Sequence, residues 1–383
     1  METVLIKETL MKEAYNQILE GMKITANNTD SQFPHYADGE SGEWVYSPYG
    51  DWTGGYWNGM NWLAAYGTND ESFLNWARKW TTLLERRIDS KTVFRGFLFY
   101  YGAALGSILK GDPMAKDIAI RAAISVSSQY NEKAGLIPLG DEAEEASSVG
   151  ITDTNIDGLS ATPLLIWASR ETGDRSLEEV AINHALKHVD LCVRNDGSVC
   201  QSATFDEFGN LHNQYTHKGY SDQSTWARAQ AWAMIHYTAA YQWAPKEKKL
   251  VEAAIRVSDW WIRHLPNDGV AYWDFDDPAI PETNRDTSAT AIAASALLKL
   301  SQLVQDEERR KTYRSIALKS VHQLISNYVT PTSSADNRRP GMLLGGCFNK
   351  KLGVAVESEL IWGDYYLLEC LSGLLGYTKP NTF

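Results

Sequence analysis

The feature that most constrains this chain is a regular alternation between two kinds of helix-forming segment. Segments such as FRGFLFYYGAALGSIL and TSATAIAASALLKL are apolar or small on every side, whereas DESFLNWARKWTTLLERR carries charges along one face. A helix that is apolar all round must be enclosed by other helices, and an amphipathic helix covers a core with one face only. The alternation therefore predicts pairs that each contain one enclosed and one outer helix.

Helical periodicity extends over most of the chain, and strand-like alternation is confined to short pieces such as Gly269–Asp274. The enclosed helices from the second onward begin roughly 60 to 70 residues apart, a spacing typical of a repeated helical hairpin. We predict an all-α fold, an α/α six-hairpin toroid with six inner and six outer helices. The helices are expected near residues 6–23, 55–66, 70–87, 94–110, 113–130, 155–172, 175–193, 222–243, 246–264, 285–303, 306–327 and 356–375.

Long loops rich in Trp, Gly, Asp and Asn precede the enclosed helices. We expect them to gather at one mouth of the barrel, where loops on a rigid scaffold commonly carry function. No linker, low-complexity stretch or charge run divides the chain, so residues 1–383 are predicted to form one domain. The loops read GEWVYSPYGDWTGGYW, QYTHKGYSDQSTWARAQAW, DGVAYWDFDDPAIPETNRDTSA and CFNKKLGVAVESELIWGDYY.

Composition narrows the class of ligand. The formal net charge of −12 disfavours nucleic acid and anionic membrane as partners, and no run of about 18 apolar residues is present. The acidic start lacks the features of a signal peptide, and the 4 cysteines form no C-x-x-C pair, so we expect a cytoplasmic protein. The 14 Trp and 19 Tyr exceed what a helical core requires, and their faces suit sugar rings as well as packing.

Asp157 is the leading candidate for a catalytic acid. It lies in the first turn of an otherwise apolar enclosed helix, in the segment TNIDGLSATPLLIWA. Desolvation there would raise the pKa of its carboxyl and keep it protonated near neutral pH. Helix capping is the alternative role, although Asp153, Thr154 and Asn155 are better placed for it.

The densest polar and aromatic stretch, HKGYSDQSTWARAQAW, spans residues 217–232. Trp226, Arg228 and Trp232 would share or adjoin one face of a helix, where a guanidinium can hold a ligand carboxylate with two parallel hydrogen bonds. A structural pair between Arg228 and Asp222 or Asp286 remains equally open.

Other chemistries lack support. His184 and His188 have a spacing that can bind metal, but their helix is expected to be an outer one and no third ligand is evident, so no metal site is predicted. The chain has no P-loop, dinucleotide fingerprint or G-x-S-x-G element.

Ordered blocks along nearly the whole chain resemble the unsaturated glucuronyl hydrolases of glycoside hydrolase family 88. They are WTGGYWNGMNWL (52–63), RGFLFY (95–100), IDGLSATPLLIWASRETGD (156–174), THKGYSDQSTWARAQAW (216–232), DGVAYWDF (268–275), RDTSA (285–289) and IWGDYY (361–366). The resemblance implies an α/α barrel that removes a terminal 4,5-unsaturated uronic acid from oligosaccharides left by polysaccharide lyases. The expected partner is thus an anionic oligosaccharide, and no cofactor is expected.

The resemblance also assigns roles to residues. It makes Asp157 the general acid/base that protonates the ring double bond at C4, with Pro163 at the family's offset. Water then enters at C5, and the resulting hemiketal collapses and expels the remaining sugar. Trp226, Arg228 and Trp232 would hold the uronate and stack on its ring, and Trp52 or Trp57 would close the other side.

Several positions depart from the family pattern. Family members usually carry His-Asp before x-Gly-Phe-Leu, whereas Phe94 stands here at the place of the second catalytic Asp, and an acid of the first loop is replaced by Gly54. A Gln near the uronate corresponds to Lys218, and a His to Gln201. We expect these changes to make the pocket more positive.

These departures suggest how the site compensates for the missing Asp. We hypothesise that Arg95 and Lys218 compensate for it, or that groups of the substrate do. Together with His217 and Gln201, they complete the expected binding residues.

Two other functions stay open. One is a glycosidase of different specificity or mechanism on the same barrel, which would need another carboxylate; Asp153, Asp222, Asp286 and Asp364 are candidates. The other is a sugar-binding protein that lost catalysis with the change at Phe94. A monomer and a homodimer are both compatible with the sequence.

Overall fold

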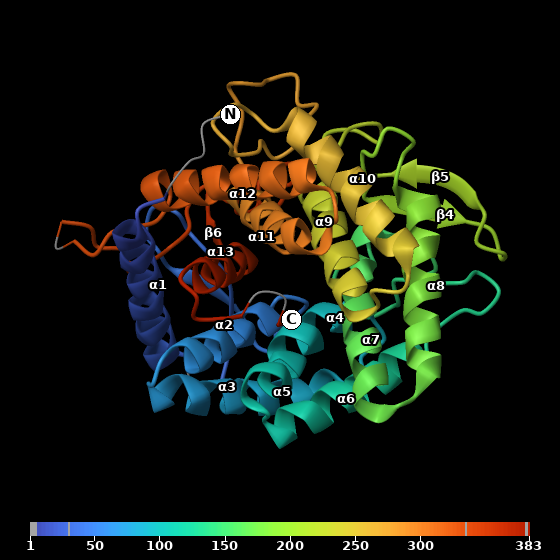
Figure 1. Cartoon of the computed structure of the whole chain (residues 1–383), viewed down its shortest axis with the longest axis horizontal. Coiled ribbons are helices and arrows are strands. Elements are labelled where there is room, and N and C mark those ends of the chain that lie inside the picture. Colours follow the sequence, from blue (N-terminus) through green and yellow to red (C-terminus); the bar gives the residue numbers. More distant parts are fainter. Residues whose placement is uncertain (1–5, 30, 334, 380–381) are drawn as a thin grey trace.

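The computed structural model describes residues 6–29, 31–333, 335–379 and 382–383. Within them, two concentric rings of helices form an α/α barrel (Figure 1). The outer ring consists of α1 (Glu8–Asn28), α3 (Glu71–Leu84), α6 (Pro113–Ser127), α8 (Arg175–Cys192), α10 (Lys248–His264) and α12 (Glu307–Asn327). The inner ring consists of α2 (Gly54–Gly67), α4 (Arg95–Phe99) continued by α5 (Leu105–Lys110), α7 (Ala161–Thr172), α9 (Ala227–Trp243), α11 (Thr287–Leu303) and α13 (Ile361–Leu374).

The burial of each helix follows its composition. Residues 227–241 of α9, 287–297 of α11 and 361–372 of α13 are buried on every side. The outer helix α10 buries one face only, through residues such as Leu250, Val257 and Trp261. The predicted all-α toroid of enclosed and outer helices is thereby confirmed.

The ring closes because the last inner helix packs against the first elements of the chain. α13 contacts α11 on one side and α2 on the other, and α1 covers it from outside. Figure 1 shows the red α13 beside the blue α1 and α2. The 3-10 helix η1 (Glu85–Arg87) extends α3, and the 3-10 helix η3 (Ile156–Ser160) precedes α7. A π-helical turn, η2 (Tyr100–Ala104), joins α4 to α5.

Helix capping differs between the two rings. The outer helices α3, α6, α8 and α12 each begin at an Asp whose side chain accepts a backbone N–H of the first turn. Among the inner elements of the described chain, α2, α4, η3, α7, α9 and α13 begin without such a side-chain bond, and only α11 has one, from Asp286. The positive ends of most inner helix dipoles are therefore left without a capping side chain of their own.

Two small sheets and several isolated bridges connect the loops that precede the inner helices. β1 (Phe33–Ala37) pairs antiparallel with both β2 (Trp44–Ser47) and β6 (Glu359–Leu360). β4 (Ser202–Phe205) pairs antiparallel with β3 (Thr154–Asn155) and β5 (Leu211–Tyr215). This pairing explains why the loops gather at one end of the barrel, as predicted. The strands themselves were not predicted.

One helix boundary differs from its prediction. The helix expected over 222–243 begins only at Ala227, because the residues before it are extended. Trp226 forms a bridge with Asp274, and the N–H of Phe275 donates to the carbonyl of Thr225 at 3.0 Å. The strand-like piece Gly269–Asp274 thus pairs through single bridges rather than a ladder.

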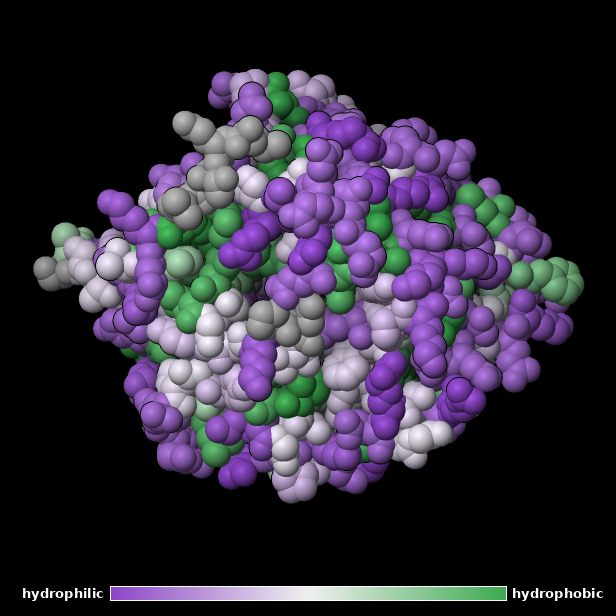
Figure 2. Space-filling model, viewed as in Figure 1, coloured by the Kyte–Doolittle hydropathy of each residue, from purple (hydrophilic) through white to green (hydrophobic). Residues whose placement is uncertain are grey.

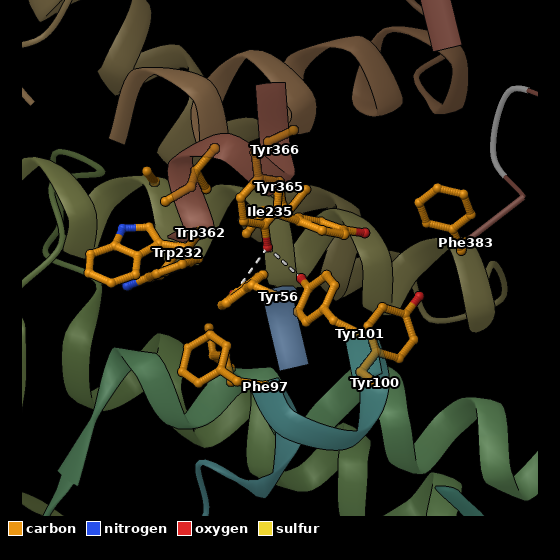
Figure 3. Close-up of a cluster of buried hydrophobic side chains, with 14 of the residues drawn as sticks. Tyr56, Phe97, Tyr100, Tyr101, Trp232, Ile235, Trp362, Tyr365, Tyr366 and Phe383 are labelled. Atoms are coloured by element: carbon orange, nitrogen blue, oxygen red, sulfur yellow. Dashed lines mark hydrogen bonds between the residues drawn. The ribbon is translucent and has the colours of Figure 1, made fainter. Parts of the chain in front are cut away.

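Aromatic side chains fill the centre of the barrel (Figure 3). Tyr56 stacks on Trp232 with ring centroids 6.1 Å apart and lies 4.6 Å from the ring of Tyr101. The hydroxyl of Tyr366 is 2.5 Å from that of Tyr101 and 3.4 Å from that of Tyr56. In Figure 3 this aromatic column extends from Trp232 toward Tyr100, so side chains rather than solvent occupy the bore.

The outside of the molecule is mainly hydrophilic on the face that Figure 2 shows, with apolar side chains in smaller patches. Among the described helices, none combines the length and the apolar character that a membrane crossing requires.

Close approach of two inner helices requires glycine at position 96. A Cβ placed on Gly96 would lie 2.2 Å from the backbone N of Ala161 and 2.2 Å from the carbonyl carbon of Ser160. Gly96→Ala should therefore lower the free energy of unfolding by roughly 1–3 kcal/mol or more, as overpacking does. Urea denaturation measures the change.

Gly373→Ala is the matched control. Gly373 also lies in an inner helix, but an added Cβ there would come no closer than 3.9 Å to Thr378 Oγ1. Its replacement should be neutral or stabilising by up to about 1 kcal/mol. Equal effects of the two substitutions would contradict the close helix contact.

Candidate active site

The carboxyl of Asp157 lies at the end of the barrel where the inner helices begin. Asp157 belongs to η3, directly before α7, and only 5 % of its surface is exposed. Its Oδ2 has no hydrogen-bond partner among the described residues. Burial, and next the nearby charge of Glu145, raise the pKa of Asp157 to about 7, while Lys218 and Arg228 act in the opposite direction. A buried carboxyl with a free oxygen and this pKa can donate a proton near neutral pH.

Two histidines of α8 hold the Asp157 segment in place. His184 Nδ1 accepts the N–H of Ile137 at 3.0 Å, so its Nε2 carries the proton and donates to the carbonyl of Gly158 at 2.9 Å. His188 Nδ1 donates to the carbonyl of His184 at 2.7 Å, which leaves Nε2 to accept the Thr154 hydroxyl at 2.8 Å. Burial lowers the pKa of His188 to about 4 and that of His184 well below its usual value.

The metal alternative for these histidines finds no support in their contacts. Both ring nitrogens of each are engaged by hydrogen bonds. No group of three potential metal ligands occurs among the residues that the structure describes. The i, i+4 spacing instead attaches an outer helix to the segment that carries Asp157.

Glu145, which the sequence did not single out, lies in the loop between α6 and β3 with 8 % of its surface exposed. Its Oε1 accepts the ammonium of Lys218, and its Oε2 lies 2.9 Å from Asn155 Nδ2 and 3.1 Å from His217 Nε2. Burial opposes ionisation of Glu145, but the charges of His217 and Lys218 outweigh burial and lower its pKa below the usual range. Glu145 is therefore held as a carboxylate.

Gln201 positions the backbone that carries His217 and Lys218. Its Oε1 accepts the Thr216 hydroxyl at 2.6 Å and the N–H of Lys218 at 3.1 Å. Its Nε2 lies 3.3 Å from His217 Nε2. The structure thus brings Gln201, His217 and Lys218 together beside Glu145, in contact with one another.

Arg228 forms the structural pair that the sequence left open. Its Nη1 donates to Asp286 Oδ2 and to the carbonyl of Cys347, both at 2.5 Å, and its Nη2 donates to the carbonyl of Phe348. The guanidinium also stacks over Trp226, 4.4 Å from the ring centroid. Its orientation is thereby fixed from several sides, and its charge is balanced by Asp286.

Aromatic rings surround these polar groups. Trp52 lies 4.8 Å from Trp362 and 6.3 Å from Trp232, measured between ring centroids. The Lys218 ammonium lies 4.8 Å from the centroid of Phe348. The rings of Trp52, Trp232, Trp362 and Phe348 therefore line the same end of the barrel as Asp157, and Figure 3 shows Trp232 and Trp362 on one side of the aromatic column.

His35 is a further member of this end of the barrel that the sequence did not indicate. Its ring lies 5.5 Å from that of Phe348, and its Nδ1 is 3.2 Å from Thr53 Oγ1. Burial lowers the pKa of His35 to about 4; Asp51 raises it and Lys218 lowers it further. His35 follows Pro34 on β1, and a single His in a short strand gives no signal of such a position.

Two expected binding residues lie elsewhere. The Arg95 guanidinium donates to the carbonyls of Thr92 and Ile88 and to the Ser125 hydroxyl, so it faces the outer helix α6. Trp57 is directed toward α3, with its ring 5.3 Å from that of Trp80 at an angle of 90°. Both occupy inner helices at positions that face the outer ring, and neither joins the Asp157 cluster.

The hypothesis of a more positive pocket is not supported by the contacts. Lys218 is neutralised by Glu145, Arg228 is neutralised by Asp286, and Arg95 is directed away from the site. Phe94, at the position of the missing Asp, is buried with its ring 6.0 Å from that of Phe97. The cations at this end of the barrel are thus matched by internal carboxylates.

The other candidate carboxylates each accept hydrogen bonds from groups other than Asp157. Asp153 accepts the Tyr215 hydroxyl at 2.9 Å, and exposed Asp222 accepts the N–H of Thr216 at 2.9 Å. Asp286 caps α11 and pairs with Arg228. Asp364 Oδ1 accepts the N–H of Leu343 at 3.1 Å, its Oδ2 has no hydrogen-bond partner among the described residues, and burial raises its pKa to about 7.

Known proteins resemble this chain over almost its whole length. The unsaturated glucuronyl hydrolase of Bacillus sp. (strain GL1) is 33 % identical over 375 residues, covering 94 % of this chain and 97 % of that protein. The unsaturated chondroitin disaccharide hydrolase of Streptococcus pyogenes serotype M1 is 31 % identical over 329 residues, covering 84 % of this chain and 80 % of that protein.

Solved structures of unsaturated glucuronyl hydrolases also match this chain. The unsaturated glucuronyl hydrolase from Streptococcus agalactiae superposes with a TM-score of 0.89 at 27 % identity, covering 99 % of this chain and 95 % of that chain. No family model matches. The extent of the similarity to the Bacillus enzyme decides the question: the chain belongs to the unsaturated glucuronyl hydrolase family.

Proposed function

We propose that this chain removes a terminal 4,5-unsaturated uronic acid from oligosaccharides, with Asp157 as the proton donor. The observation that carries the proposal is the Asp157 carboxyl itself. It is buried, one of its oxygens has no partner, and its pKa, raised first by burial, is about 7. The relatives' names supply the substrate class.

In the proposed reaction the acid form of Asp157 transfers its proton to C4 of the ring double bond. The positive charge that develops at C5 is met by water, and the resulting Asp157 carboxylate takes up the proton that water loses. The hemiketal at C5 then collapses and expels the remaining sugar. Asp157 ends each cycle in the acid form in which it began.

The surroundings of Asp157 suit an anionic sugar at the end of a chain. Uncapped N-termini of inner helices favour a negatively charged ligand there. Arg228 already stacks over Trp226, and Tyr56 and His236 stack on Trp232, which leaves Trp52 as the tryptophan for contact with a sugar ring. Because Asp157 is only 5 % exposed, a chain end can reach it more readily than the middle of a polysaccharide.

The alternative of a glycosidase with an acid and a separate carboxylate base receives less support. Such a mechanism needs a second carboxylate with an oxygen free to act. Glu145 is the carboxylate whose charge acts on Asp157, and both of its oxygens already accept hydrogen bonds from protein groups. Asp364 has a free oxygen but lies beside Leu343 and does not act on Asp157. The measurements below test whether the substrate is instead an intact uronoside, and whether the protein binds sugar without turnover.

Asp157→Asn should abolish turnover while leaving binding intact. The amide has the same shape but cannot supply the proton, and general acid catalysis contributes about 10²- to 10⁴-fold. Loss of the double-bond absorbance measures turnover of an unsaturated disaccharide, and calorimetry measures its binding. The matched control Asp153→Asn, in the preceding loop, should keep turnover within a few-fold. Full activity of Asp157→Asn would refute the assignment.

The rate should fall as the pH rises through about 7. The raised pKa of Asp157, caused mainly by burial, means that the acid form is abundant below pH 7 and decreases about tenfold per pH unit well above it. The profile of kcat/KM with pH should therefore have an alkaline limb near 7. A rate that increases from pH 7 to pH 9 would show that a carboxylate, not a carboxylic acid, starts the reaction.

Only substrates with the ring double bond should be consumed. A panel of unsaturated disaccharides with different linkages and sulfation is compared with the saturated disaccharides of the same composition, and product formation is followed by chromatography. Cleavage of the saturated compounds without cleavage of the unsaturated ones would favour the alternative glycosidase. Binding of the unsaturated compounds without turnover would favour a sugar-binding protein.

A further inference from the structure

The family resemblance of the sequence places a second acidic residue at position 94, where this chain has Phe94. Phe94 is 2 % exposed and its ring packs near Phe97, so no polar group replaces the acid at that position. A carboxyl that must be protonated at neutral pH requires either deep burial or a neighbouring negative charge, and a neighbouring cation works against it. Lys218 and Arg228 both act on Asp157 in that unfavourable direction.

Glu145 is placed to counter these cations. It lies 12 residues before Asp157 along the chain, and its Oε2 accepts from Asn155, two residues before Asp157. Its Oε1 binds the ammonium of Lys218, the residue after His217. With both oxygens bonded to donors, Glu145 stays ionised, and its charge acts on Asp157.

We infer that Glu145 is a positioning residue: it offsets Lys218 and so keeps Asp157 in the acid form that the proposed reaction needs. The inference rests on the proposed function. Glu145 acts through Asp157 and does not touch the sugar, because both of its oxygens are occupied by Asn155, His217 and Lys218. Asp157 and Glu145 thus divide two tasks, proton transfer and charge compensation, between a neutral and an ionised carboxyl.

The remaining groups around Asp157 leave this division intact. From α8, His184 and His188 are hydrogen-bonded through both nitrogens, and burial lowers the pKa of each, so they stay neutral. The charge of Asp157 also acts on Cys192 of α8 and Tyr56 of α2, and burial raises the pKa of both. From α9, the charge of Arg228 is paired with Asp286. Lys218 is the cation whose balance depends on Glu145, with His217 as its other charged neighbour when protonated.

Glu145→Gln tests the inference through the pH profile. The substitution leaves the Lys218 ammonium without a carboxylate partner, which favours the ionised form of Asp157. The alkaline limb of kcat/KM should therefore move down by about one pH unit or more. Activity should be lost mainly above pH 6 and largely regained at pH 5. Glu144→Gln is the matched control: Glu144 is the adjacent residue, it pairs with Arg87 at 3.2 Å, and its substitution should leave the limb unchanged.

The double variant Glu145→Gln/Lys218→Met separates a charge effect from structural damage. Removing both members of the ion pair should return the limb toward its original pH, because the unbalanced cation is gone. If each substitution damaged the packing, the two losses of activity would instead add up in the double variant. If Glu145→Gln does not fold, Lys218→Met alone must shift the limb to higher pH, since Glu145 then acts on Asp157 unopposed. Inactivity at every pH without a shift, unrelieved in the double variant, would overturn the inference.

Direct titration distinguishes failure of the inference from failure of the proposed function. With ¹³C-labelled aspartate, the carboxyl resonance of Asp157 is assigned by its absence in Asp157→Asn and is followed with pH in the unmodified protein and in Glu145→Gln. A lower midpoint in Glu145→Gln supports the inference even if no unsaturated sugar is consumed, in which case only the proposed function fails. An unchanged midpoint overturns the inference even if the enzyme turns over unsaturated substrates.

Discussion

Enclosure of the inner helices determines where chemistry can occur in this molecule. A helix that is covered on every side by other helices presents only its ends, and here the centre between the helices is filled by aromatic rings. Polar and titratable side chains with a catalytic task must therefore lie near the helix ends, and the Asp157 cluster lies where the inner helices begin. Asp157, Arg228 and Asp286 all lie within two residues of such a helix start or the short helix before it.

The balance of charge at that end follows from the same enclosure. Ions removed from water need a partner of opposite sign, and each cation of the cluster has one: Lys218 pairs with Glu145 and Arg228 with Asp286. Asp157 is the carboxyl without such a partner, which is why burial dominates its pKa. The lack of an ion-pair partner for Asp157 gives it the property that the reaction requires.

The sequence predicted the helices well because their signal is local. The boundaries of α2, α6 and α8 agree with expectation within a few residues, since periodicity and end signals lie inside each segment. Asp157 could be singled out for a related reason, as an acid in an apolar first turn. The strands and the delayed start of α9 were missed because they depend on pairing with distant loops.

Much of the candidate site could not be predicted because it is assembled from long-range contacts. Glu145 and Lys218 are 73 positions apart, and Glu145 lies in an acid-rich loop that resembles ordinary solvated sequence. Arg95 and Trp57 were misplaced because a helix buried on all sides gives no sign of which face is directed at the outer ring. Which cation neutralises Glu145 is likewise a property of the folded chain alone.

The aromatic column has a consequence for the order of events in catalysis. With Tyr56, Tyr101 and Tyr366 closing the bore behind the cluster, the barrel is a cup and not a tunnel. Under the proposed function, the sugar chain and both fragments would then use the same end of the barrel. Under the same proposal, the oligosaccharide product would extend toward solvent and leave first, and the monosaccharide fragment beside Asp157 would leave last and compete with each incoming chain end.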